Sequence, residues 1–203
     1  MVASRDGVRV VPHLAPVVES AVESGGVVGI DMPIGLPHDR PRACDREARR
    51  FLGARRSSIF EPPRRVTLGA ADHAEAQRRS VALHGTGLSV QAWNLVPKIR
   101  EVDQVMTSAL EDHVVEVSPE CAVRLLLGRV PAPKRTAGGA AERRDALEAV
   151  FGPLPARLAG SRPDDVLDAY AVLWSAERFA RGEHVTFGDG ARDERGLLMR
   201  IVM

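Results

Sequence analysis

VVGIDMPIGLP, residues 27–37, places a single carboxylate, that of Asp31, directly after an apolar run. The run from Val27 to Ile30 is rich in β-branched residues, which is typical of a strand that is buried on both faces. The Met-Pro-Ile-Gly-Leu-Pro that follows is interrupted too often by Pro and Gly to continue a strand or a helix. Asp31 is then either a turn residue at the end of a strand or a side chain aimed at a ligand.

The residues before this stretch predict a strand–helix–strand unit. MVASRDGVRVV predicts two short extended pieces around residues 5–7, because Asp-Gly is a strong hairpin signal. A helix is expected to begin at Pro12 and to end at Gly25-Gly26. Together with the run at 27–30, this order predicts an α/β sheet.

The residues after it predict helices and one more strand. Residues 38–110 are expected to be mainly helical, with loops at 62–63 and 85–87, and HVVEVSPE at 113–120 reads as a short strand that ends at Pro119. Residues 161–182 form the clearest helix in the sequence. Ser161 and Asp164 have capping-box spacing, Pro163 suits a first turn, and Gly182 suits the C-terminal end.

The composition is that of an ordinary globular protein. A chain of 203 residues that is 44% apolar and 27% charged predicts one domain, residues 1–203, with a mainly helical, Arg-rich insertion at about 38–110. The net charge of +1 gives no global argument for a polyanionic partner. Cys44 and Cys121 are far apart and lack metal-ligand spacing, so we expect a reducing, cytoplasmic location. No apolar run approaches ~18 residues, so we expect no membrane span.

Several acidic residues lie within apolar segments, where burial of a carboxylate costs free energy. Asp168 follows the first turn of a helix that is apolar nearly all round, and Asp165 shares its face at i, i+3. Asp165 also has a simpler interpretation, since carboxylates in a first turn favour the helix macrodipole. Glu116 sits inside an apolar strand, and Glu120 follows it closely. For Glu116, a structural ion pair with an arginine is the alternative.

These acids are expected to converge. Acids at the carboxyl ends of neighbouring parallel strands meet in one crevice, where α/β proteins usually bind ligands. A cluster of Asp and Glu without His or Cys suits Mg²⁺ or Mn²⁺ better than zinc. The expected metal ligands are Asp31, Glu116, Glu120, Asp165 and Asp168.

Basic residues gather in the predicted insertion. Nine arginines and three acids lie between residues 40 and 65. Guanidinium groups bind phosphates well, although a solvated helix face with pairs such as Asp45–Arg49 is the alternative for most of them. The phosphate-binding candidates are Arg42, Arg49, Arg55, Arg56, Lys98 and Arg100, and Lys134, Arg135, Arg143 and Arg144 are further basic residues.

A series of blocks in this order resembles a known family. GIDMPIGLP, RACDREARRFLGARRSSIFEPPRR, GTGLSVQAWNLVPKIREVD, VVEVSPE, DDVLDAYAVLWSAERFARG and GLLMRIV follow one another over nearly the whole chain. The chain is identified by these blocks as a member of the bacterial and archaeal domain of unknown function 429 family, described as predicted RNase H-like nucleases.

The resemblance implies an α/β fold of the RNase H-like class. Its mixed sheet would have five strands in the order 3-2-1-4-5, with helices on both faces. Residues 27–31 would be the fourth strand with Asp31 as a metal ligand, and 113–117 the fifth strand with Glu116. Asp165 and Asp168 would take the role of the acids on the C-terminal helix.

One expected part is missing from the sequence. Relatives begin with a strand of the Gly-Ile/Val-Asp-Gly type that carries the first metal-binding Asp, whereas this chain begins at MVAS. A misassigned start codon, a truncated chain, a partner chain that supplies the strand, for example in a homodimer, and a degenerate protein are the competing explanations. We favour the first, and we expect the chain as given to be inactive or much impaired.

The hypothesis is metal-dependent phosphodiester hydrolysis by a nuclease. The catalytic candidates are Asp31, Glu116, Asp165 and Asp168, with Mg²⁺ or Mn²⁺ as cofactor and nucleic acid or a phosphorylated small molecule as partner. The alternatives are a non-catalytic nucleic-acid- or nucleotide-binding protein of the same fold, and a hydrolase or transferase that acts on a small phosphorylated metabolite.

Overall fold

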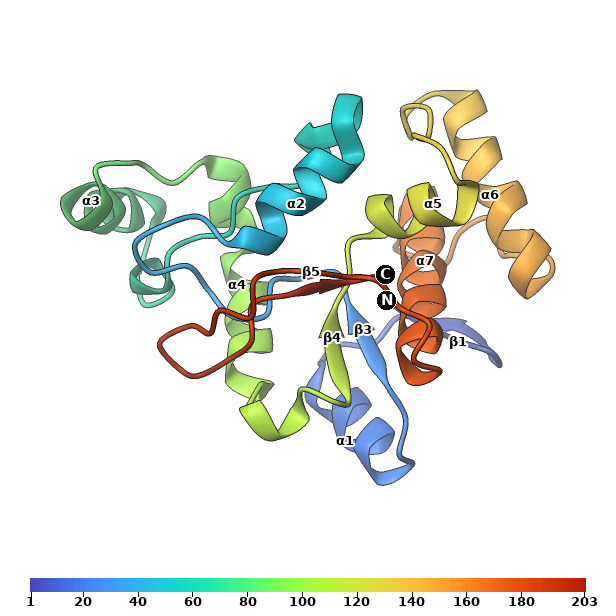
Figure 1. Cartoon of the computed structure of the whole chain (residues 1–203), viewed down its shortest axis with the longest axis horizontal. Helices are drawn as coiled ribbons and strands as arrows, with labels where there is room; N and C mark the ends of the chain where they lie inside the picture. The colour runs from blue at the N-terminus through green and yellow to red at the C-terminus, as the bar shows by residue number, and fades with distance from the viewer.

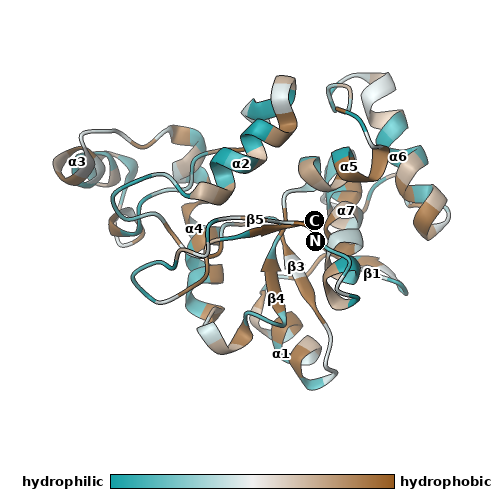
Figure 2. Ribbon diagram, in the orientation of Figure 1, coloured by the Kyte–Doolittle hydropathy of each residue, from teal (hydrophilic) through white to brown (hydrophobic). Residues whose placement is uncertain are grey.

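A parallel pair of short strands forms the centre of the computed structural model, which describes residues 1–203 apart from the side chain of His84. Strand β3, Val28–Ile30, pairs with β4, Val114–Glu116, so that Ile30 lies opposite Glu116. Hydrophobic residues run along both strands (Figure 2). The parallel register brings the carboxyl ends of both strands to the same edge, directly before Asp31 and Val117.

The remaining strands form two small antiparallel sheets. β1, Val2–Ser4, and β2, Gly7–Arg9, form the predicted hairpin, and β5, Thr186–Phe187, pairs with β6, Ile201–Val202. A parallel bridge between Val117 and Val202 links β6 to the end of β4. The described residues thus form three two-stranded sheets rather than the single five-stranded sheet that the resemblance implied.

The hairpin does not extend the central pair because it packs on a helix instead. Ala3 and Val8 lie against the apolar cluster that includes Val166 and Tyr170 of α7, Pro163–Ala180. Their apolar side chains are therefore covered by α7, and the hairpin pairs only with itself among the described strands. The fold is mixed α/β, and the assignment to the RNase H-like class stays a prediction.

Helices cover both faces of the central pair. On one face, Val115 packs with Val172 of α7. On the other, Val114 and Ile30 pack with Val18 of α1, Ala15–Glu23, and with Val102 of α4, Val90–Val105. This arrangement explains why the strands carry apolar residues on both faces rather than alternating, with Glu116 at the end of β4 as the exception.

The segment between β3 and β4 is mainly helical, as predicted. It contains α2, Ala43–Leu52, α3, His73–His84, and α4, together with the 3₁₀ helices η1, Gly53–Ser58, η2, Arg65–Thr67, and η3, Ser108–Leu110. α5, Pro119–Leu127, and α6, Ala137–Phe151, follow β4. In Figure 1, α2 to α4 lie to the left of the central pair and α5 to α7 to its right. No helix within the described residues is both long and apolar enough to cross a bilayer.

The start of α7 corrects one detail of the sequence analysis. The N-terminal cap is Arg162, whose backbone N–H donates to the Asp165 carboxylate at 2.9 Å. The predicted capping pair of Ser161 and Asp164 is wrong by one residue, because the hydroxyl of Ser161 donates to the carbonyl of Leu158 in the preceding turn. Pro163 opens the helix as expected.

Gly29 lets α7 approach the central pair closely. A Cβ atom at this position would lie 2.7 Å from Cγ1 of Val172 and 3.0 Å from its carbonyl oxygen. We expect Gly29→Ala to lower the free energy of unfolding by about 1–3 kcal/mol, because the core must shift to make room. Urea denaturation measures this loss.

Val172→Ala provides the matched test of that cause. If the valine methyl is the obstacle, the double variant should lose less stability than the sum of the two single changes. Simple additivity would contradict the packing explanation.

Candidate active site

A cleft of about 520 Å³ opens at the carboxyl ends of β3 and β4. Its walls come from the segment after β3, the first turn of α2, η1, the first turn of α5, the loop before α6, and α7. The acids that line it are Asp31, Asp45, Glu116, Glu120 and Asp168, and the bases are Arg42, Arg55, Lys134 and Arg135. Four of the five predicted metal ligands therefore line one cleft, as the convergence argument expected.

Asp31 is the acid with the fewest contacts. No side chain or backbone group among the described residues donates a hydrogen bond to it or forms an ion pair with it. Its side chain is exposed to solvent on the cleft side, while protein atoms surround it elsewhere. This enclosure raises the pKa of Asp31 well above its ordinary value, and the nearby Asp168 carboxylate raises it further.

Asp168 is paired with a lysine from another element. The ammonium group of Lys134 lies 3.0 Å from Oδ2 of Asp168 and 3.5 Å from Oδ2 of Asp164. Burial raises the pKa of Asp168, and Lys134 offsets only part of that rise. Burial lowers the pKa of Lys134, but the charge and hydrogen bond of Asp168 oppose it, and the net shift is upward. Lys134 is therefore a firmly charged group beside the carboxylates.

Glu116 belongs to a buried ion-pair network. Both of its oxygens accept hydrogen bonds from Arg42, at 2.6 and 2.7 Å, and the backbone N–H of Ile34 donates to one of them at 2.7 Å. Arg42 also donates to both oxygens of Asp45 and is only 2% exposed. The contacts of Glu116 are thus those of the structural ion pair that the sequence left open as an alternative.

Among the described residues, only one of the two carboxylate oxygens of Glu120 has a hydrogen-bond partner. It stands in the first turn of α5, which the Ser118 hydroxyl caps by accepting the N–H of Cys121. Its Oε2 accepts a hydrogen bond of 2.7 Å from Arg143, which is 2% exposed. Its Oε1 is buried and has no hydrogen-bond partner within the described part of the chain, with Nη2 of Arg55 at 3.9 Å.

Asp165 does not line the cleft. Its carboxylate accepts the backbone N–H of Arg162 at the start of α7. This is the simpler role that a first-turn acid can take, and it leaves Asp168 as the acid of that helix in the cleft.

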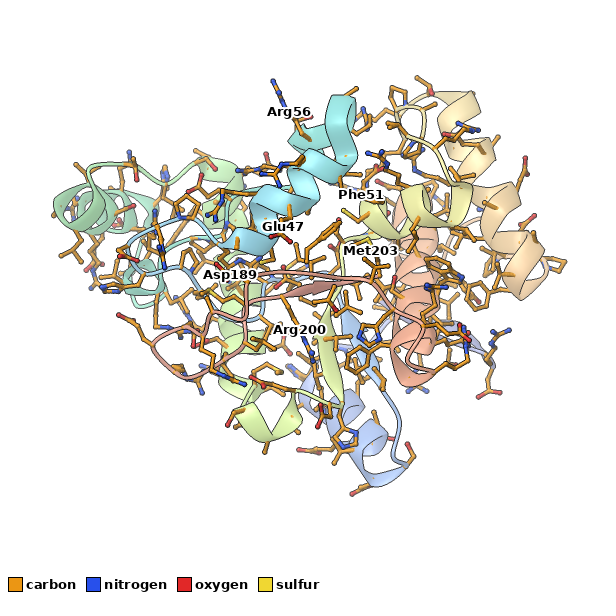
Figure 3. The ribbon with its side chains drawn as sticks, in the orientation of Figure 1. Glu47, Phe51, Arg56, Asp189, Arg200 and Met203 are labelled. Atoms are coloured by element: carbon orange, nitrogen blue, oxygen red, sulfur yellow. The ribbon has the colours of Figure 1, made fainter. Side chains whose placement is uncertain are left out.

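The predicted phosphate-binding residues are scattered. Arg55 lines the cleft and is the one candidate on η1 that does so, whereas Arg56 points away from the molecule (Figure 3). Arg49 donates to the carbonyl of Ile59, and Arg100 donates to that of Leu68 beside a separate small cavity. Lys98 is exposed and does not line the cleft, although its charge lowers the pKa of Asp31.

The structure adds two residues that the sequence analysis did not single out for the site. Asp45 pairs with Arg42, three residues before it, rather than with Arg49. Lys134 was only one of several further basic residues, because nothing in its Pro-rich loop indicates which acid it would meet. The one feature of the sequence that could have indicated Lys134 as a site residue is the basic pair Lys134-Arg135 directly after Pro133.

The acids as placed do not form a closed metal cage. Within the described residues, no three His, Cys, Asp or Glu side chains group closely enough to hold a metal ion. Asp31 and Asp168 are two carboxylates in one cleft, and Mg²⁺ commonly takes one or two protein carboxylates and fills its other positions with water and phosphate oxygens. The donor set of this pair therefore fits a hard divalent cation.

The comparison with protein families identifies the relatives of the chain. A family model described as "Protein of unknown function (DUF429)" matches residues 1–192. The chain belongs to the DUF429 family. No curated protein and no solved structure matches the chain. The description of the DUF429 family names no activity.

Removal of the Arg42 side chain should greatly lower the stability of the fold. Arg42→Ala would leave the Glu116 and Asp45 carboxylates buried without a counter-ion, which typically costs about 3–5 kcal/mol. We expect a loss of this size in urea denaturation. Arg50→Ala, an exposed position on the same helix, should change stability by less than about 0.5 kcal/mol. Similar effects of the two changes would contradict the role of the network.

Asp31→Asn should stabilise the protein at neutral pH. The raised pKa means that the folded protein holds this proton to a higher pH than the unfolded chain, so ionisation above about pH 4 lowers stability. We expect a higher melting temperature for the variant at pH 7, with the difference vanishing at pH 4 and below, measured in metal-free buffer.

Asp145→Asn, at an exposed position of α6, is the control for that experiment. It should leave the melting temperature unchanged at each pH. A lower melting temperature for Asp31→Asn at pH 7 would show that the carboxylate is favourable in the folded state, contrary to our account.

Proposed function

We propose that this DUF429 protein is a metal-dependent phosphodiester hydrolase, a nuclease of the RNase H-like superfamily. The observation that carries the proposal is the pair of carboxylates in the cleft, of which Asp31 has no hydrogen bond and Asp168 has a single lysine partner. Such crowded, raised-pKa acids are typical of functional sites. The position of the cleft, at the carboxyl ends of parallel strands, also supports it.

Asp31 and Asp168 would hold the cation. The two carboxylates repel each other, and a bound divalent cation would neutralise both charges. Bound there, Mg²⁺ or Mn²⁺ would act as a Lewis acid toward a phosphate oxygen and would lower the pKa of a bound water molecule. Glu116 would act indirectly, since its bonds to Arg42 and to the N–H of Ile34 fix the segment that follows Asp31.

The basic side chains would bind the phosphate. Lys134 and Arg135 come from the loop before α6, and Arg55 comes from η1 on another wall of the cleft. A phosphate placed beside Lys134 and Arg135 would meet positive charge close to the carboxylate pair, and the charge of Arg55 would add to the attraction from another wall. Lys134 would release Asp168 to bind the phosphate, which would leave the Asp168 carboxylate free to hold a cation together with Asp31.

Mn²⁺ binding tests this assignment without requiring turnover. We expect Asp31→Asn and Asp168→Asn each to weaken Mn²⁺ binding by at least about tenfold in isothermal titration calorimetry, because each removes one of two carboxylate ligands. Asp165→Asn should bind Mn²⁺ as the wild type does, since Asp165 caps α7 outside the cleft. Any hydrolysis of oligonucleotides with Mn²⁺ should follow the same order.

Equal Mn²⁺ affinity in the wild type and in all three variants would refute the carboxylate pair as a metal site. Binding of oligonucleotides without cleavage would favour the non-catalytic binding protein.

A small phosphorylated substrate is the second candidate. The cleft volume of about 520 Å³ lies within the range of small-molecule sites, about 300–1,000 Å³. The net charge of +1 also gives no general attraction to a long polyanion. Mn²⁺-dependent release of phosphate from a nucleoside monophosphate, with no cleavage of oligonucleotides, would favour this candidate.

A further inference from the structure

Two buried polar atoms without hydrogen-bond partners in the described structure belong to residues that line the cleft. One is Oε1 of Glu120, a side chain that is 9% exposed, and the other is Nε of Arg55. Neither has a hydrogen-bond partner among the residues that the structure describes. Buried polar atoms are nearly always paired, so an orphaned acceptor and an orphaned donor in one cleft need an explanation.

The position of Glu120 is fixed from behind. Arg143 holds its other oxygen at 2.7 Å and is itself anchored by bonds to the carbonyls of Ala132 and Gly139, both at 2.7 Å. Glu120 therefore cannot turn away to find another partner without breaking a buried ion pair. Its unpaired oxygen faces the side from which Arg55 approaches.

Arg55 does not supply the missing hydrogen bond to Glu120. Nη2 of Arg55 is 3.9 Å from Oε1 of Glu120, which is beyond hydrogen-bonding distance. Arg55 is also 24% exposed, so its side chain has room to shift toward solvent and admit a ligand atom. The corner of the cleft between Oε1 of Glu120 and Arg55 is thus spanned by a long ion pair without a hydrogen bond.

The chemistry of the corner selects one kind of ligand group. A phosphate oxygen would suit Arg55 but would be repelled by Glu120, and a metal ion would suit Glu120 but would be repelled by Arg55 and Arg143. A hydroxyl suits both, because its O–H can donate to the carboxylate while its oxygen accepts from the guanidinium.

We propose that Glu120 and Arg55 form a hydroxyl-binding subsite that recognises the ribose 2′-hydroxyl of an RNA strand. The choice of hydroxyl rests on the proposed function, since within a phosphodiester-linked strand the 2′-hydroxyl is the sugar hydroxyl that remains free. Lys134 and Asp168 line the same cleft, so the sugar would lie beside the phosphate and carboxylate groups. A site that is built around a hydroxyl discriminates strongly against the analogue that lacks it.

The test compares RNA and DNA tetranucleotides of matched sequence, bound in EDTA and followed by fluorescence anisotropy. We expect the wild type to bind the RNA at least about tenfold more tightly than the DNA. Glu120→Gln keeps an amide oxygen for Arg143 but removes the free carboxylate acceptor, and Arg55→Met removes the donor while keeping the apolar stem. Both variants should bring the affinity ratio close to one.

Arg56→Met is the matched control, because Arg56 lies on the same 3₁₀ helix but points away from the molecule (Figure 3). It lowers the charge by the same amount as Arg55→Met and should keep the wild-type ratio. Equal binding of RNA and DNA by the wild type, an unchanged ratio in Glu120→Gln and Arg55→Met, or no measurable binding of either strand would overturn the proposal, and a water molecule would then be the occupant of the corner.

The failure of this subsite is distinguishable from failure of the proposed function. Binding in EDTA involves neither metal nor hydrolysis, so a retained RNA preference without Mn²⁺ binding would refute the metal site and support the subsite. Mn²⁺-dependent cleavage of RNA and DNA at equal rates, with equal binding of the two strands, would support the metal site and refute the subsite.

Discussion

The buried pairing of Arg42 with Glu116 is the interaction on which the geometry of the cleft depends. One guanidinium joins the end of β4, the first turn of α2 and, through the carbonyls of Ile34 and Gly35, the segment that leaves β3. Charges removed from water are tolerated only when all their partners are in place. The network therefore favours one arrangement of these three elements and positions two walls of the cleft before any ligand arrives.

The acids of the cleft divide into satisfied and unsatisfied groups. Glu116 and Asp45 are fully engaged with Arg42, and Glu120 is engaged through one oxygen, whereas Asp31 has no partner within the described structure. A folded protein gains nothing in stability from an unpaired carboxylate that lies near a second carboxylate. An unpaired carboxylate near Asp168 is the pattern expected when a site sacrifices stability for ligand binding.

Local patterns in the sequence were enough to predict much of the fold, because apolar runs, Pro, Gly and the Asp-Gly turn act over a few residues. They located β3, β4, the β1–β2 hairpin and α7 closely. They did not place the hairpin against α7, nor did they show the division into small sheets, because both depend on contacts between distant segments. The same limit applies to the site: Arg42 meets Glu116 across 74 residues, and Lys134 meets Asp168 across 34.

The segment after Asp31 shows why its side chain can be free while its position is fixed. The N–H of Ile34 is held by Glu116, and the N–H of Leu36 is held at 3.0 Å by Asp193, whose side chain is fully buried. Gly35, with a φ of 73°, turns between them where a Cβ would lie 2.8 Å from Cγ of Met199. Two carboxylates and a tight turn thus define the backbone beyond Asp31 without forming a hydrogen bond to its carboxylate. A ligand that binds there meets a preorganised group, because the cost of positioning Asp31 is met during folding.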